Sequence, residues 1–251
     1  MNTFATIGGT QRRVDLARPI DLSVPIDFSE AGLRHFGAPA PRSAPFATTG
    51  FTGDVGRGAS CNCRTLTLTP HCHGTHTECV AHLTREPLDA WRLVPVQPLA
   101  AIVVSVTPER IGDDCVVTRD ALLAAWPQSH EAPSPIALIL RTAHPGGTEP
   151  PYVATDAAAL VVARGIAHLV IDQPSLDRTH DEGRLAAHRV FFGLPAGSRS
   201  LGEATRAFAT VTELAQVPDA LPDGACALAW QVPAIAGDAV PSRPLAYRYE
   251  T

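Results

Sequence analysis

One short window of the chain, residues 70–83, gathers side chains that bind metals or carry protons. It reads Pro-His-Cys-His-Gly-Thr-His-Thr-Glu-Cys-Val-Ala-His-Leu and holds four of the ten histidines in the 251-residue sequence. Imidazole, thiolate and carboxylate groups are the ligands that a borderline divalent metal such as zinc prefers. Isolated histidines and cysteines often serve only packing or surface roles. Their concentration here predicts a metal or catalytic centre.

The spacing within this window suits a single centre. Cys72, His76, Glu78 and His82 stand at successive offsets of four, two and four residues, and Gly74 lies between the first two. Glycine lets the backbone turn tightly because it has no Cβ atom. We therefore expect a compact loop that aims three of these side chains at one point.

Composition narrows the class of protein. The chain is 45% hydrophobic with a net charge of -5 and a pI near 6.0. Such a chain can bury a sizeable core, and it offers no basic face for nucleic acid. We find no long apolar run and no apolar centre of a signal peptide at the N-terminus. We expect a cytoplasmic protein that binds neither nucleic acid nor a membrane.

The cysteines allow two interpretations. The chain has six, and four of them, Cys61, Cys63, Cys72 and Cys79, crowd into one short stretch. Disulfides among them would cross-link little of the chain, so we expect reduced thiols. Alternatively, these four and their neighbouring histidines could close a structural zinc site, although Cys-x-Cys is not the usual spacing for one.

Patterning along the rest of the chain predicts a mixed α/β fold. The 23 prolines and 19 glycines indicate many turns. We expect a loose arm at 1–17, one domain at 18–251, and a long ordered loop at 27–58 that acts as a functional cover. Its phenylalanines, Phe36, Phe46 and Phe51, either line a pocket or only anchor the loop. Alternation and apolar runs predict strands at 19–26, 64–69, 101–106, 136–142, 167–172, 210–214 and 225–232. Helices are expected at 119–126, where Thr118 can cap the first turn, at 155–164 and at 184–192, with a short turn or helix at 88–93.

The histidine-rich window resembles a motif of the cyclase-like metal hydrolases, which include bacterial kynurenine formamidase and isatin hydrolase. That family carries His-x-Gly-Thr-His-x-Asp-x-Pro-x-His, and here Cys72 to His82 keep the glycine, the threonine and two histidines. Cysteine replaces the first histidine, glutamate the aspartate and valine the proline. Further stretches are similar in the same order, at 21–23, 172–177, 187–189, 211–214 and 241–244.

The resemblance implies a swivelling β/β/α domain, with a mixed sheet or barrel-like core and outer helices. It places first-site metal ligands on Cys72, His76 and Glu78, second-site ligands on His188 and Glu213, and proton transfer on His82.

Two assignments stay open. If the loop is shifted by one residue, His71 or His73 would reach the metal in place of Cys72. Glu203 competes with Glu213 for the last position, but its Gly- and Ser-rich setting is typical of a solvated surface charge.

The function implied is hydrolysis of an amide or cyclic amide bond in a small metabolite, with a divalent metal as cofactor. Zinc is expected, with manganese as the alternative, and relatives of this type imply a homodimer or higher homo-oligomer. Two other readings remain: a family member that lost its metal through the changes at Cys72 and Glu78 and only binds a ligand, and the structural zinc protein described above.

Overall fold

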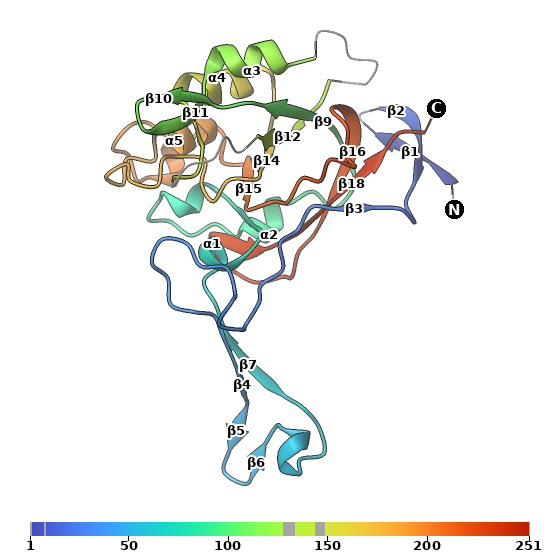
Figure 1. Ribbon diagram of the computed structural model, residues 1–251, viewed down its shortest axis with the longest axis vertical. Coiled ribbons are helices and arrows are strands. Elements are labelled where there is room, and N and C mark those ends of the chain that lie inside the picture. The colour runs from blue at the N-terminus through green and yellow to red at the C-terminus, as the bar shows by residue number, and fades with distance from the viewer. Residues whose placement is uncertain (1, 8, 128–133, 144–148, 251) are drawn as a thin grey trace.

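A curled mixed sheet of nine strands runs through the computed structural model, which describes residues 2–7, 9–127, 134–143 and 149–250 (Figure 1). Its strand order is β17-β8-β15-β14-β12-β9-β16-β18-β3. Four neighbouring strands are parallel: β15 (Thr210–Glu213), β14 (His168–Ile171), β12 (Ala137–Thr142) and β9 (Leu99–Val106). The expected α/β class and mixed sheet with outer helices are confirmed.

Antiparallel strands flank this parallel centre on both sides. On one side lie β8 (His76–Glu78) and β17 (Ala239–Pro241), and on the other lie β16 (Gly224–Gln231), β18 (Arg243–Arg248) and β3 (Ile20–Asp21). The strand expected at 19–26 pairs in this sheet only over β3. A separate small sheet joins β10 (Glu109–Ile111), β11 (Asp114–Val117) and β13 (Tyr152–Val153).

The central strands are apolar on both faces because both faces are covered. Ile102 and Leu138 belong to the core beneath the helices, whereas Val103 and Ile139 belong to a second core on the opposite face. Side chains alternate between the two faces of a strand, so a continuous apolar run fills both cores.

Helices cover one face of the sheet (Figure 1). They are α3 (Arg119–Ala125), α4 (Thr155–Ala163) and α5 (Ala186–Phe192), close to the predicted ranges. Thr118 caps α3 as expected, because its hydroxyl accepts a hydrogen bond from the amide of Ala121 at 3.1 Å. The short helix α2 (Ala90–Leu93) and the single turn α1 (Pro70–His73) lie near the edge strands β8 and β17. Among the described residues, no helix combines the length and the apolar character needed to cross a bilayer.

The N-terminal stretch differs from the expected loose arm. It forms a hairpin of β1 (Asn2–Ile7) and β2 (Thr10–Asp15). Ile7 and Val14 are buried against Leu245 and Tyr247 of β18. The apolar residues of this stretch, Phe4, Ala5, Ile7 and Val14, follow no regular alternation, which is why the sequence pattern missed this hairpin.

The expected cover loop also differs from the structure. Between β4 (Arg42–Pro45) and β7 (Arg64–Thr67) the chain runs out and back as a paired arm, with β5 (Ala47–Thr48), β6 (Phe51–Thr52) and the turn η1 (Val55–Arg57) toward its tip (Figure 1). The period-two pattern at 64–69 correctly predicted a strand, but its side chains are exposed. Phe46 is 43% exposed on this arm. The arm delivers the chain directly into α1 and the histidine-rich window.

Candidate metal centre

The pairing of β8 with β15 brings the first three polar side chains together. Glu213 lies opposite His76 in the antiparallel register, and Glu78 follows two residues along the same strand. Alternation therefore places all three on one face, where His76 Nε2 lies 3.4 Å from Glu213 Oε2. The intervening Thr77 and Thr212 turn to the other face and join their hydroxyls at 2.8 Å.

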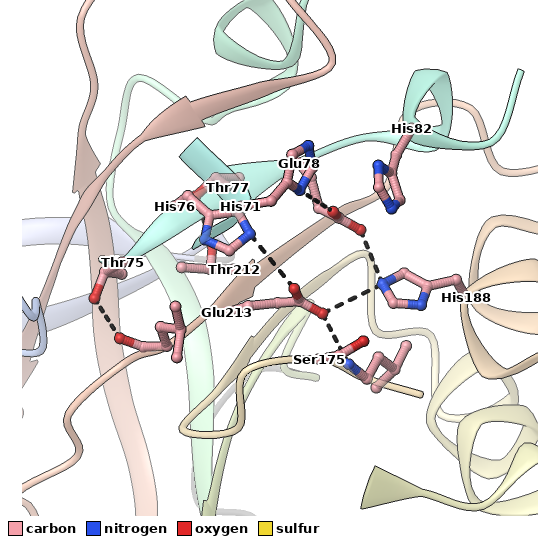
Figure 2. Close-up of polar contacts among 12 residues, drawn as sticks. His71, Thr75, His76, Thr77, Glu78, His82, Ser175, His188, Thr212 and Glu213 are labelled. Carbon is pink, nitrogen blue, oxygen red and sulfur yellow. Dashed lines mark hydrogen bonds and ion pairs between the residues drawn. The ribbon is translucent and has the colours of Figure 1, made fainter. Parts of the chain in front are cut away.

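Helix α5 adds His188 from the side (Figure 2). Its Nε2 atom lies 2.9 Å from Glu78 Oε1 and 3.3 Å from Glu213 Oε1. Its Nδ1 atom lies 2.6 Å from Asp177 Oδ2. Asp177 also accepts hydrogen bonds from the amides of Ala187 and His188 in the first turn of the helix. One carboxylate thus fixes both the helix start and the imidazole orientation.

Helix α1 adds a further imidazole from the opposite side. His71 Nδ1 lies 3.1 Å from Glu78 Oε2, and its Nε2 lies 3.0 Å from Asp238 Oδ2. His82 stacks beside His71 with ring centres 4.4 Å apart, and its Nδ1 lies 3.4 Å from the same Asp238 oxygen. Figure 2 shows His71, His76, His82 and His188 surrounding Glu78 and Glu213.

The turn that presents these residues depends on Gly74. A Cβ atom there would lie 2.9 Å from the carbonyl oxygen of Val24 and 2.9 Å from the side chain of Ile26. The following Thr75 amide donates to the Val24 carbonyl at 3.1 Å, and the Thr75 hydroxyl accepts from the Val24 amide at 2.7 Å. The predicted tight turn is therefore confirmed, and its cause is the close approach of the segment near Val24.

The cluster concentrates buried charge. Burial alone would raise the pKa of Glu78, but the positive charges of His82 and His188 outweigh it and lower the pKa. Burial likewise opposes protonation of His188, yet Glu78 and Asp177 raise its pKa well above the ordinary value. For His71, the contacts with Asp238 and Glu78 overcome burial and raise the pKa to about 10. The buried carboxylates therefore need positive charge nearby, which protonated imidazoles or a bound cation could supply.

Several buried atoms in the cluster lack a hydrogen bond. They are His76 Nε2, both carboxylate oxygens of Glu78 and His188 Nε2. Leaving such atoms unsatisfied costs about 1–3 kcal/mol each. Three sets of ligand atoms lie within 4.8 Å of one another: His71, His76 and Glu78; Glu78, His188 and Glu213; and His71, His82 and Asp238. Nitrogen and carboxylate donors in this arrangement fit one or two divalent cations.

Most predicted site residues converge here, with one correction. His76, Glu78, His188 and Glu213 lie in the two sets that contain Glu78, and His82 lies in the third. Cys72 is in none of the sets, whereas His71 is in two of the sets together with Glu78 or His82. The physical reason is the helical turn α1, which rotates successive side chains by about 100°, so neighbouring residues cannot face the same point.

The structure places the residues of the other open alternatives, His73 and Glu203, away from the cluster. His73 Nδ1 accepts from the amide of Thr69 at 2.9 Å, and its Nε2 lies 2.9 Å from the Pro39 carbonyl, so both nitrogens are used locally. Glu203 is exposed in the short turn η3 (Leu201–Glu203), whereas Glu213 is buried in the cluster. Asp238 and Asp177 were missed as site residues, because neither belongs to the histidine-rich window; Asp177 closes one of the stretches that drew the resemblance.

The cysteines do not form a shared site in the described part of the chain. All six are free, with Cys61 and Cys63 exposed on the arm and Cys72 and Cys79 buried at its base. No cysteine belongs to a ligand set among the described residues. Burial raises the pKa of the Cys72 thiol. It also raises the pKa of the Cys79 thiol, to about 12. Among the described residues, the geometry does not support the four-cysteine zinc site.

A cavity of about 340 Å³ lies close to the cluster, at the carboxyl ends of β12, β14 and β15. His35, Gln173 and Leu214 contribute to its lining. Leu214 directly follows the cluster residue Glu213. Gln173 is only 2% exposed, yet neither its amide oxygen nor its amide nitrogen has a hydrogen bond within the described residues. His35 Nε2 is likewise buried without a hydrogen bond in the described structure, so the cavity is mostly apolar with unused polar atoms on two lining residues, as small-molecule sites are.

Comparison with known proteins agrees with this picture. Residues 16–178 match the family model Cyclase, described as "Putative cyclase". No curated protein matches the sequence. The fold is similar to a predicted metal-dependent hydrolase from Bacillus stearothermophilus, with a TM-score of 0.60 and 18% identity over 92% of this chain and 98% of that chain.

Two further solved structures share the fold. A potential metal-dependent hydrolase with cyclase activity gives a TM-score of 0.64 and 16% identity over 93% of this chain and 99% of that chain. Isatin hydrolase A from Labrenzia aggregata gives a TM-score of 0.60 and 17% identity over 93% of this chain and 94% of that chain. At such identities the similarity establishes the fold alone.

Proposed function

The chain belongs to the Cyclase family, and on that premise we propose that it is a metal-dependent hydrolase that cleaves an amide or cyclic amide bond in a small metabolite. The observation that carries the proposal is the buried cluster of imidazole and carboxylate groups around Glu78, whose possible ligand atoms face one another. Similar folds are named as metal-dependent hydrolases, one of them an isatin hydrolase. We propose zinc as the metal, with manganese as the alternative, since the donors are nitrogen and carboxylate oxygen.

We assign two roles to the residues of the site: metal ligands and a residue that transfers protons. His71, His76 and Glu78 would hold one cation, and Glu78 with His188 and Glu213 would hold a second. When bound, such a cation polarises a carbonyl group and lowers the pKa of water. Because Glu78 belongs to both sets, it is the residue on which the whole site depends.

We assign proton transfer to His82. Its ring centre lies 6.0 Å from that of His188, so it borders the cluster, yet its side chain is 29% exposed and can exchange protons with solvent. In this role it takes a proton from the attacking water and returns it to the leaving nitrogen. It is more exposed than the proposed metal ligands, of which His71 is 20% exposed and Glu78 1%.

The nearby cavity supports a small, largely apolar substrate. Gln173 offers one donor and one acceptor there, which is the pairing that an amide or lactam group requires. Its position beyond Glu213 would bring the bond to be cleaved close to the cluster. Formamides of the kynurenine type and lactams of the isatin type are therefore the substrates to test first.

The experiment starts from protein purified without chelator. Its metal content is measured, and hydrolysis of isatin and of an aromatic formamide is followed with and without added zinc or manganese. We expect bound metal and metal-dependent hydrolysis. Chain purified with no metal, and inactive after metal is added, would reject the hydrolase in favour of a ligand-binding protein.

A substitution tests the assignment of His82. His82→Asn should keep its metal and lose a factor of about 10²–10⁴ in kcat. His180→Asn is the matched control, because His180 is exposed and outside the cluster. Full activity in the His82 variant would show that another group carries the proton.

A further inference from the structure

Asp238 touches the cluster without lying inside it. One of its carboxylate oxygens lies 3.0 Å from His71 Nε2 and 3.4 Å from His82 Nδ1. The side chain is 44% exposed, in contrast to Glu78 at 1%. A carboxylate that is open to water on one side and contacts two histidines on the other could be either a metal ligand or a group that orients ligands.

The backbone holds Asp238 in a fixed place. Its carbonyl oxygen accepts a hydrogen bond from the amide of Cys79 at 3.0 Å. The preceding Gly237 donates its amide to Asp89 Oδ1 at 3.2 Å and accepts from the amide of Ala90 at 2.8 Å. The following residue begins β17, where Ala239 lies opposite Glu78. The carboxylate is therefore anchored to the same strand, β8, that carries the cluster.

The two nitrogens of His71 face different partners. Nε2 faces Asp238 at 3.0 Å, and Nδ1 faces Glu78 Oε2 at 3.1 Å. A neutral imidazole carries hydrogen on one nitrogen and a lone pair on the other. If Nε2 donates its hydrogen to Asp238, the lone pair of Nδ1 must point at the cluster. Histidine ligands in proteins are commonly oriented by a carboxylate in this way.

The hydrogen bonding of the cluster distinguishes between the two roles of Asp238, metal ligand and orienting group. Within the described part of the cluster, the buried atoms without a well-aligned hydrogen bond are on His76, Glu78 and His188, and all of them belong to the two sets that share Glu78. Asp238 differs from them, because its carboxylate is partly exposed to water and is hydrogen-bonded to both His71 and His82. The set of His71, His82 and Asp238 is thus explained without a cation of its own.

We propose that Asp238 is a positioning residue that fixes the His71 ring with hydrogen on Nε2, so that Nδ1 is presented to the metal. The proposal rests on the proposed function only in requiring that the cluster binds a divalent cation. It also accounts for how His71 replaces Cys72: a histidine on the adjacent turn position serves as a ligand because a separate carboxylate orients it. The longer contact with His82 makes that residue a secondary partner.

Metal affinity provides the first test. The full chain is stripped of metal, and its affinity for zinc is measured by competition with a chromophoric chelator. We expect Asp238→Ala to weaken zinc binding about 10–100-fold. Asp238→Asn should weaken it less, because its amide oxygen can still accept the Nε2 hydrogen. The matched control is Asp219→Asn, an exposed aspartate outside the cluster, which should bind zinc like the parent.

A spectroscopic readout separates positioning from general structural damage. In zinc-loaded protein with ¹⁵N-labelled histidine, long-range ¹H–¹⁵N correlations report which ring nitrogen carries hydrogen, and a His71→Gln variant assigns the His71 signals. We expect hydrogen on Nε2 in the parent and in Asp238→Asn, and a mixture of tautomers or loss of this pattern in Asp238→Ala. The melting temperatures of the stripped variants serve to exclude misfolding as the cause.

The outcomes distinguish the two proposals. If the parent binds zinc, and Asp238→Ala binds it equally well with the same His71 pattern, the positioning role is wrong and the proposed function stands. If Asp238→Ala binds one zinc ion fewer than the parent, Asp238 is a ligand and the positioning role is again wrong. If the parent itself binds no zinc, manganese or cobalt, both the proposed function and the role of Asp238 fail.

Discussion

Two buried histidines at opposite ends of the same pair of strands have opposite chemistry. His168 begins β14 beside Thr210 of β15, and its Nδ1 lies 2.9 Å from the threonine hydroxyl. Burial, helped by the charge of Arg206, lowers the pKa of His168 to about 4. At the other end of β15, His188 meets Glu213, and neighbouring carboxylates raise its pKa well above the ordinary value.

The difference shows that burial does not by itself identify a functional histidine. His168 is 8% exposed and His188 is 1% exposed, so the two are similarly hidden from water. His168 has a neutral hydroxyl as partner, and it is a structural residue. His188 faces two glutamates with an unsatisfied Nε2. Buried carboxylates around an unsatisfied imidazole are what distinguish the metal end of the strands from the structural end.

The largest expected effect comes from removing one of these carboxylates. Glu213→Gln should weaken zinc binding more than 100-fold, beyond the roughly 10–100-fold range of residues that only orient ligands. Glu203→Gln, the exposed competitor for the same role, should leave binding unchanged. Zinc titration of the stripped proteins measures both. If Glu213→Gln and Glu203→Gln bind zinc equally well, Glu213 is not a metal ligand. The contrast between the His188 end and the His168 end of the strands would then be wrong.

The next largest effect is expected at His168, the structural end of the strands, where the free energy of unfolding should depend on pH. The unfolded chain protonates His168 near its ordinary pKa of 6.5, whereas the folded chain resists protonation down to about 4. The free energy of unfolding therefore falls as the pH drops through this window, by about 2 kcal/mol near pH 5.

Denaturant unfolding of the parent and of His168→Gln, near pH 7 and near pH 5, measures this effect. The glutamine cannot take up a proton, so its loss of stability on acidification should be about 2 kcal/mol smaller than that of the parent. An identical loss in both proteins would mean that His168 titrates normally in the folded chain, and the contrast with His188 would then be unfounded.

A smaller effect is expected at Gln173, the polar side chain beside the cluster. Both atoms of its amide are buried without a hydrogen bond in the described structure. Gln173→Met has a similar shape without polar atoms, so we expect the metal-free protein to gain about 1 kcal/mol in stability. Hydrolysis should weaken, mainly through a higher KM. A loss of stability would show that the amide has a structural partner, like Thr210 beside His168.

The smallest effect is expected on the arm. Cys61 and Cys63 are exposed, and they should react with iodoacetamide at the same rate whether or not zinc is bound. The buried Cys72, Cys79, Cys115 and Cys226 should be protected in the folded protein. Mass spectrometry of the labelled peptides measures both. Protection of Cys61 and Cys63 by zinc would revive the structural zinc site.

Local pattern predicted the elements of the sheet and most of the cluster. The apolar runs of β9 and β12, the cap at Thr118 and the spacing of His76 and Glu78 are properties of neighbouring residues, and each was recognised. His188 and Glu213 were expected from the family resemblance, because they are more than a hundred residues from the window. The periodic pattern of apolar residues along the chain cannot show that such distant positions lie in contact.

The misses share one physical cause. The single helical turn α1 points His71, and not Cys72, toward the cluster. The position of Asp238 depends on the pairing of β17 with β8. The hairpin of residues 2–15 is held by two side chains that pack on β18. All three follow from tertiary contacts between segments far apart in the chain, which a pattern of adjacent residues does not encode.

The placement of β8 between β15 and β17 has a consequence for how the protein is made. β8 is synthesised early, but its partners on both sides come from residues 210–213 and 239–241. During synthesis, the histidine-rich window therefore leaves the ribosome long before the strands that pair with it. The complete set of possible ligands can form only after residue 241 has been synthesised, so a cation that needs all of them would bind to the folded protein.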